Sequence, residues 1–259
     1  MLITTEKLGH ILLIGLNRPE KLNAMNLEAL NQFAEAYQML DSDPDLRVGV
    51  VFAHGEHFSA GLDLAEVGPE VAKNGPGALA GSGQIDPYGL WGDRVSKPIV
   101  MAVHGIAYTL SIELALAADI VIAADNVRFR QLEIGRGIMP FGGATLRAPT
   151  QLGWGNAMRF LLTGEEFGGH EALRIGLVQE VVPVGTDTDR AIEIAELIAK
   201  QAPLGVTASL ANARVAVESG EKAAIEHLRE ILPTILTSAD AAEGVKSFLE
   251  RREGNFTGK

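Results

Sequence analysis

Two glutamates place carboxylates where acid/base chemistry on a small substrate is possible. Glu113 lies in the apolar segment Ser111-Ile112-Glu113-Leu114-Ala115, which predicts the start of a buried helix, and Glu133 follows the next strand along the chain. Two carboxylates in different environments can divide the work of a general acid and a general base. This arrangement favours an enzyme.

Each glutamate taken alone also fits a structural role. A buried carboxylate without a partner is costly, so Glu113 must be paired, protonated or functional. An ion pair explains Glu113 as well as catalysis does, because structural ion pairs also perturb acids. Glu133 lies three residues after Arg130, and a lone glutamate after a strand is typical of a surface salt bridge.

A segment rich in small residues supplies a third feature. It runs from Gly55 to Leu64 after an expected strand, and its Ser59, Ala60 and Gly61 would let the backbone approach a ligand closely. Its N–H groups could donate to a carbonyl oxygen, as could those at the start of the helix that carries Glu113. An ordinary glycine turn is the alternative explanation.

Short runs rich in Val and Ile alternate with helical patterns along the first part of the chain. The segment 27–40 repeats apolar residues every three or four positions, and Asn26 fits the N-cap, so an amphipathic helix is expected there. The alternation predicts an α/β fold with largely parallel strand connections. The expected strands are Ile11–Leu16, Val48–Ala53, Ile99–Val103 and Ile120–Ala124.

Two regions depart from this alternation. The segment Gly68 to Asp93 contains Gly-Pro-Gly, Gly-Ser-Gly and Asp-Pro, so we expect turns and a mobile insertion that shapes the substrate pocket. Helical patterns replace strand patterns from Asp187 onward. We therefore divide the chain into an α/β core at 1–190 and a C-terminal helical segment at 191–259. The expected C-terminal helices are 191–201, 203–219, 221–236 and 239–252.

Composition excludes several classes of function. The 259 residues carry a formal net charge of -11, which disfavours binding to nucleic acid or to an anionic membrane. Cysteine is absent, which excludes disulfides and thiolate metal sites and fits a cytoplasmic location. The sequence shows no cationic leader and no bilayer-spanning apolar run, so we expect neither export nor membrane insertion. His54 and His57 have no third ligand, so no metal is expected.

Several segments resemble the crotonase, or enoyl-CoA hydratase/isomerase, superfamily, and are most similar to its enoyl-CoA hydratases. The resemblance runs nearly end to end, and several motifs in register are far more specific than any one of them. They are LNRPEKLNAM at 16–25, FSAGLD at 58–63, the segment Lys97 to Asp119, the segment Arg128 to Glu133, and IMPFGGAT at 138–145.

The resemblance implies a fold, an assembly and a substrate. The fold would be a crotonase-like spiral of repeated ββα units with a C-terminal helical segment, and chains would form homotrimers or dimers of trimers. The substrate would be an acyl-CoA thioester, so that coenzyme A is part of the substrate and no separate cofactor is needed. The backbone N–H groups of Ala60 and Leu110 would form the oxyanion hole. CoA would be contacted by Lys21, Leu22, Ala24, Ala60, Gly61, Leu62 and Asp63.

Both glutamates fall where hydratases of this family carry their catalytic glutamates. The resemblance therefore implies an enoyl-CoA hydratase, a lyase of fatty acid metabolism that adds water across the 2,3 double bond of a 2-enoyl-CoA. Glu133 would transfer the proton at the α/β carbons, while Glu113 would orient and activate the water.

One departure from the family pattern leaves alternatives open. Thr109-Leu110-Ser111 stands where the family usually has three glycines. The N–H of Leu110 remains, but its side chain adds bulk beside the reacting atoms. Enoyl-CoA isomerisation therefore stays open, as does a non-catalytic acyl-CoA-binding or assembly protein. An RNA-binding role conflicts with the excess of acidic residues.

Overall fold

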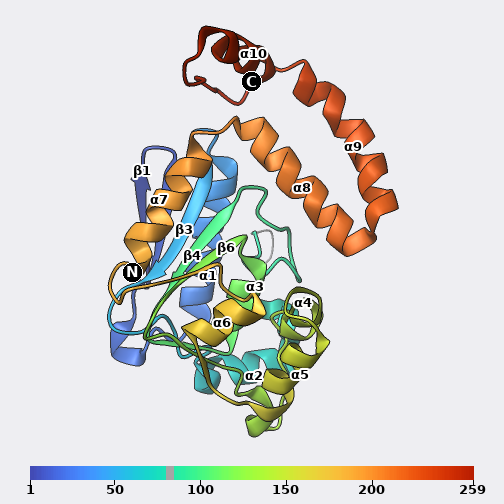
Figure 1. The fold of residues 1–259 in the computed structure, drawn as a ribbon. Helices are drawn as coiled ribbons and strands as arrows, with labels where there is room; N and C mark the ends of the chain where they lie inside the picture. The colour runs from blue at the N-terminus through green and yellow to red at the C-terminus, as the bar shows by residue number, and fades with distance from the viewer. Residues whose placement is uncertain (80–84) are drawn as a thin grey trace.

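A six-stranded sheet forms the centre of this computed structural model, which describes residues 1–79 and 85–259 (Figure 1). The strand order is β1-β2-β3-β4-β6-β9, with β1 and β2 antiparallel and every later pair parallel. The predicted α/β class and its four strands are confirmed with the same bounds. The strands are β1 (Ile3–Leu8), β2 (Ile11–Leu16), β3 (Val48–Ala53), β4 (Ile99–Val103), β6 (Ile120–Ala124) and β9 (Glu180–Val182).

A second, smaller sheet was not predicted, because its strands are only two or three residues long. It contains β5 (Ile106–Tyr108), β7 (Arg128–Arg130) and β8 (Phe167–Gly168). β5 and β7 pair in parallel with Tyr108 opposite Arg130. β5 leads into the helix that carries Glu113, and β7 leads to Glu133. The pairing of the two strands therefore sets the relative positions of the two glutamates.

Helices cover both faces of the main sheet, because side chains along each strand point alternately to opposite faces. On one face, Ala191, Ala195 and Ala199 of α7 (Asp187–Ala199) pack against strand residues such as Val48 and Val100. The other face packs against α1 (Leu27–Ser42) and α3 (Leu110–Ala117). The predicted N-cap of α1 is confirmed, since Asn26 Oδ1 accepts a hydrogen bond from Ala29 N at 2.9 Å.

The segment expected to be turns is partly helical. α2 (Leu64–Asn74) and the 3-10 helix η2 (Pro76–Leu79) extend into it. The expectation is wrong for this part because Val67 is fully buried and Val71 packs beside it, which gives α2 an apolar face. Pro69 lacks a donor N–H, and the helix continues past it. The rest of the expected insertion includes residues 80–84, which lie outside the described residues.

The C-terminal helices extend away from the sheets (Figure 1). They are α8 (Pro203–Ser219), α9 (Glu221–Leu236) and α10 (Ala239–Glu250), close to the predicted bounds. No residue of α8 is buried. Arg47 ties the C-terminal segment to the core, donating to Ala199 O at 2.7 Å and to Phe256 O at 2.6 Å. The proposed boundary at residue 190 stays a prediction.

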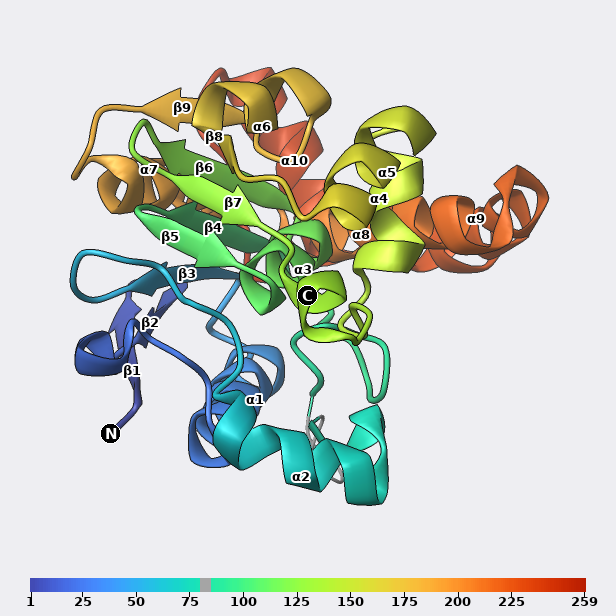
Figure 2. The ribbon, with the colours of Figure 1, turned by 90° about the horizontal axis from the view of Figure 1, so that it is seen from below.

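Three shorter helices lie beside the second sheet (Figure 2). They are α4 (Ala144–Gln151), α5 (Trp154–Thr163) and α6 (Gly169–Ile175). The N-terminus of α4 approaches α3, and this contact reaches one of the glutamates. Among the described residues, no helix has both the length and the apolar character needed to cross a bilayer.

Candidate active site

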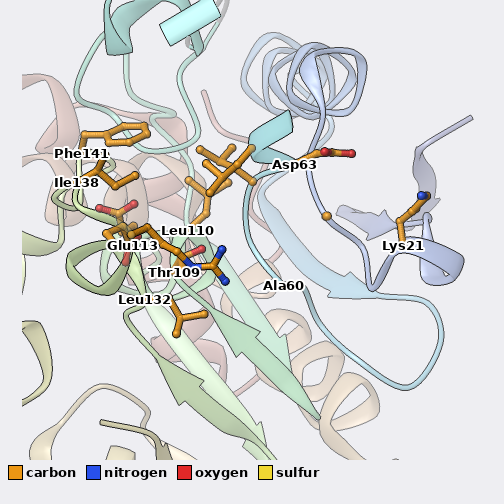
Figure 3. Close-up of a pocket in the computed structure, with 14 residues that line it drawn as sticks. Lys21, Ala60, Asp63, Thr109, Leu110, Glu113, Leu132, Ile138 and Phe141 are labelled. Atoms are coloured by element: carbon orange, nitrogen blue, oxygen red, sulfur yellow. The ribbon is translucent and has the colours of Figure 1, made fainter. Parts of the chain in front are cut away.

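One cavity of about 360 Å³ brings most of the predicted site residues together. It lies where α3, the 3-10 helix η3 (Glu133–Arg136), the segment before α2 and the 3-10 helix η1 (Pro19–Lys21) meet. Figure 3 shows Glu113, Leu110 and Thr109 on one side of it and Lys21 on the other. Of the predicted residues, Lys21, Ala24, Ala60, Leu62, Asp63, Leu110, Glu113 and Glu133 line the cavity, whereas Leu22 and Gly61 do not.

Glu113 is almost completely buried, on the first turn of α3. Its Oε1 accepts hydrogen bonds from the backbone N–H of Gly142 at 2.7 Å and of Ala144 at 3.2 Å. Burial raises the pKa of Glu113 to about 7, and the nearby Glu133 adds to the rise. The hydrogen bonds from these two N–H groups and the positive charge of Arg147 lower the pKa of Glu113. The carboxyl can therefore take up or release a proton near neutral pH.

Glu133 is also buried, and one of its oxygens has no protein partner. Gln131 Nε2 donates to Oε1 at 3.4 Å, while Oε2 has no hydrogen bond to any described residue. Burial raises the pKa of this carboxyl as well. The surface salt bridge considered for Glu133 is not formed with any described residue. An unsatisfied buried oxygen on a cavity wall is poised to bind a ligand group.

One expected oxyanion-hole donor already has an acceptor within the chain. The N–H of Ala60 donates to Leu22 O at 2.9 Å, so its single hydrogen is already used within the chain. The neighbouring Leu62 forms an isolated parallel bridge with Met25, in which Met25 N donates to Gly61 O and Asp63 N donates to Met25 O. The N–H of Leu62 itself has no acceptor among the described residues. Because Leu62 also lines the cavity, its N–H is available where that of Ala60 is not.

The second expected donor, Leu110, keeps a free N–H. Leu110 is the first residue of α3, and the first N–H groups of a helix have no intrahelical acceptor. The residue before it, Thr109, has φ 50 and ψ -109, an uncommon backbone conformation for a β-branched residue. Its Oγ1 packs so tightly against Gly61 that a Cβ on Gly61 would lie 1.9 Å away. The segments that carry Leu62 and Leu110 are therefore held against each other.

Asn23 fixes the turn that forms the opposite wall. Its side chain accepts a hydrogen bond from Arg18 N at 2.7 Å and donates to His54 O at 2.9 Å and His57 O at 2.8 Å. Its backbone is left-handed, with φ 52, a conformation that asparagine tolerates better than most residues. The turn thus presents Lys21 and Ala24 to the cavity.

Part of the cavity wall consists of residues that were not predicted from the sequence. The additional lining residues are Leu64, Thr109, Leu132, Arg136, Ile138 and Phe141. Most are apolar, which suits a hydrocarbon chain beside the two carboxylates. Arg136 could have been found from its position three residues after Glu133, because residues i and i+3 of a 3-10 helix lie on the same face.

The described part of the chain contains no cluster of three or more His, Asp or Glu side chains able to hold a metal ion. The expectation that neither a metal nor a separate cofactor is needed stays a prediction.

The whole sequence and fold were then compared with known proteins. The family model described as enoyl-CoA hydratase/isomerase matches residues 6–259. The chain belongs to this family. Members of the enoyl-CoA hydratase/isomerase family share the crotonase fold, so the predicted spiral architecture is confirmed by the solved structures that superpose on the whole chain.

Individual relatives within the enoyl-CoA hydratase/isomerase family differ in their named activities. The chain is 32% identical over 255 residues to enoyl-CoA hydratase EchA19 of Mycobacterium tuberculosis, covering 97% of this chain and 94% of that protein. It is 36% identical over 259 residues to carnitinyl-CoA dehydratase of Escherichia coli K12, covering 97% and 96%. A crystal structure of a probable enoyl-CoA hydratase/isomerase from Mycobacterium abscessus has a TM-score of 0.95 and 50% identity, covering 100% and 99%.

Proposed function

We propose that the chain is an enoyl-CoA hydratase that adds water across the 2,3 double bond of a 2-enoyl-CoA. The observation that carries this proposal is the pair of buried glutamates, Glu113 and Glu133, which line one cavity and both have a raised pKa. Relatives named as a hydratase and as a dehydratase support a reaction in which water is added or removed. The coenzyme A of the substrate is the only cofactor that the reaction needs, and the proposed location is the cytoplasm.

The thioester oxygen accepts hydrogen bonds from the free N–H groups of Leu62 and Leu110. Negative charge grows on this oxygen as the α carbon gains electron density, so the donors stabilise the transition state more than the ground state. We assign Leu62 in place of Ala60 because Ala60 N already donates to Leu22 O. Loss of one such donor typically costs about 3 to 4 kcal/mol of barrier.

The two glutamates divide the proton transfers. Glu113 accepts a proton from water as the water oxygen bonds to C3, and Glu133 donates a proton to C2. The hydrogen bonds from Gly142 N and Ala144 N fix the orientation of the Glu113 carboxyl. Exchange with solvent afterwards returns the proton that Glu133 lost and removes the one that Glu113 gained.

CoA enters along the wall that includes Lys21, Ala24 and Asp63. Lys21 and Asp63 lie across the cavity from Glu113 (Figure 3). Arg18 holds this wall together by donating to Ala24 O and to Asp63 Oδ2, each at 3.0 Å.

The proposed assembly is a homotrimer or a dimer of trimers. Apolar side chains on the C-terminal helices are exposed in the single chain, and Val217, Phe248 and Leu249 are each more than two thirds exposed. Burial of such side chains between subunits would remove apolar area from water. Light scattering should give three or six times the chain mass, and the mass of a single chain would contradict the assembly.

The first experiment measures loss of the conjugated enoyl-thioester absorbance with crotonyl-CoA and with a longer 2-enoyl-CoA. The wild type should consume both or one of them, and Glu113→Gln and Glu133→Gln should each lower the rate by about 100- to 10,000-fold. Conversion of a 3-enoyl-CoA to its conjugated isomer without hydration would assign isomerisation instead. Binding of acyl-CoA without either reaction would support the non-catalytic alternative.

A further inference from the structure

Arg136 lies on the same wall of the cavity as Glu133. Both belong to η3, a single turn of 3-10 helix in which residues i and i+3 are eclipsed. Gly137 ends this turn with φ 74, and its N–H donates to the carbonyl oxygens of Glu133 and Ile134. Both Glu133 and Arg136 line the cavity. The turn therefore presents a guanidinium and a catalytic carboxyl to the same space.

The charge of Arg136 is not neutralised within the described part of the chain. No carboxylate there lies within salt-bridge distance of its guanidinium, whereas Arg18 on the opposite wall pairs with Asp63 at 3.0 Å. The cation that lowers the pKa of Glu113 is Arg147. The arginine side chain carries a fixed positive charge and five N–H donors, so the guanidinium of Arg136 can bind an anionic group of a ligand.

Apolar side chains line the cavity together with Arg136. They include Leu132, Ile138 and Phe141, and Glu133 lies one 3-10 turn before Arg136. Lys21, at the CoA wall, lies across the cavity from Glu113, Leu132 and Ile138 (Figure 3). Arg136 is solvent-exposed in the single chain, so an anionic group of a bound substrate can reach its guanidinium. A carboxylate matches the guanidinium with two parallel hydrogen bonds.

We infer that the preferred substrate is a 2-enoyl-CoA whose acyl chain carries a carboxylate, and that Arg136 binds this carboxylate. This inference rests on the proposed hydration and assigns its substrate class. Arg136 is a specificity-determining residue, and Glu113 and Glu133 perform the same proton transfers as for an uncharged chain.

The test compares substrates matched in length that differ in one charge. The pairs are 2-pentenoyl-CoA with glutaconyl-CoA, whose C5 is a carboxylate, and 2-hexenoyl-CoA with 2-hexenedioyl-CoA. The methyl ester of glutaconyl-CoA controls for size without charge. Wild type should show a kcat/KM about 10- to 100-fold higher for at least one of the two dicarboxylic substrates than for its uncharged partner.

Arg136→Leu should remove this preference and leave kcat/KM for the uncharged chains within a few-fold of wild type. Arg136→Lys should retain part of the preference, because lysine keeps the charge but loses the planar pair of donors. Lys21→Met, at the CoA wall, should affect charged and uncharged acyl chains equally.

Two results would overturn the inference while leaving hydration intact. One is a wild type without preference for either dicarboxylic chain. The other is an Arg136→Leu variant that loses affinity equally for all substrates, which would assign Arg136 to a phosphate of CoA. If the wild type hydrates no substrate, hydration itself fails, and calorimetric binding of glutaryl-CoA against pentanoyl-CoA decides. A preference for glutaryl-CoA that Arg136→Leu abolishes supports the carboxylate site, and equal binding overturns it.

Discussion

Gly142 approaches Glu113 so closely that a Cβ at position 142 would lie 2.5 Å from Oε2 of the glutamate and 2.8 Å from its Cδ. The same glycine donates its N–H to Oε1 at 2.7 Å. Its backbone is not left-handed, so glycine is required at this position for space. The orientation of the Glu113 carboxyl thus depends on a residue without a side chain.

Substitution of Gly142 by Ala should displace the Glu113 carboxyl. We expect kcat for enoyl-CoA hydration to fall by at least about 100-fold, because a small misplacement of a catalytic group has effects of this size. Gly155→Ala is the matched control, since a Cβ there meets no atom within 4 Å. The control should keep its activity and gain up to about 1 kcal/mol of stability, because alanine restricts the unfolded chain. An unchanged kcat in Gly142→Ala would contradict the role of this contact.

The rate should depend on the ionisation of Glu113. Glu113 must be ionised to accept a proton from water, and burial raises its pKa to about 7. The kcat/KM for crotonyl-CoA should therefore rise with pH through about 7 as Glu113 ionises, and should fall at higher pH, where Glu133 has lost the proton that it donates to C2. A pH profile of initial rates measures this. A rise that is complete by about pH 5, the range of an ordinary glutamate, would show that Glu113 is not the limiting base.

Folding stability should also depend on Glu113, with the opposite trend. The folded-state pKa of about 7 exceeds the ordinary glutamate value of 4.5, so folding favours the protonated carboxyl. The protonated form contributes its full stability below about pH 4.5, and this contribution is lost as the pH rises through about 7. Glu113→Gln, which stays neutral, should gain roughly 2 to 3 kcal/mol relative to wild type between about pH 5 and about pH 8. Urea unfolding at both pH values measures the difference, and a pH-independent difference would contradict the shift.

Gly61 and Thr109 should behave as an energetically coupled pair. Gly61→Ala introduces a Cβ 1.9 Å from Thr109 Oγ1 and requires alanine to adopt φ +99. The combined clash and strain should cost at least about 3 kcal/mol. Thr109→Gly removes the clash but not the strain at position 61, so the double variant should recover at least about 1 kcal/mol relative to additivity. Urea unfolding of all four proteins tests this, and strict additivity would exclude the contact.

Asn23 allows the hydrogen bonds of a turn to be separated from its backbone conformation. Asn23→Gly keeps the left-handed conformation but loses three side-chain hydrogen bonds, and should cost about 2 to 4 kcal/mol of unfolding free energy. Asn23→Ala should cost about 1 kcal/mol more, because alanine disfavours φ 52. Both variants should raise KM for the CoA thioester, since the turn carries Lys21 and Ala24. Equal stability of the two variants would show that the backbone conformation contributes nothing.

Segments with a strong local sequence pattern were predicted with the correct secondary structure. The strands β2, β3, β4 and β6 are buried apolar runs between Gly, Pro or Asp residues, and their bounds were predicted correctly. Part of the expected insertion was wrong because Val67 and Val71 give α2 an apolar face, and the turn signals used for the prediction lie after this helix.

At the site, residue types were easier to predict than the directions of backbone groups. Both glutamates line the cavity as expected. The donor expected at Ala60 could not be checked from the sequence, because its acceptor, Leu22 O, comes from a segment almost forty residues away in the chain. Which N–H stays free is decided by the φ of Gly61 and by the pairing of Leu62 with Met25.

The pairing of Tyr108 with Arg130 shows how the separation of the two glutamates in the sequence arises. Glu113 follows Tyr108 after one turn of α3, and Glu133 follows Arg130 after two intervening residues. The intervening chain, including β6 and the turn at Asp125, leaves the second sheet and returns to it. An insertion at that turn would lengthen the interval without moving either carboxylate, whereas a single residue added between Arg130 and Glu133 would turn Glu133 away from the cavity. Alignments of related chains should therefore be anchored on the paired strands, and the number of residues between the acids can vary among proteins with the same chemistry.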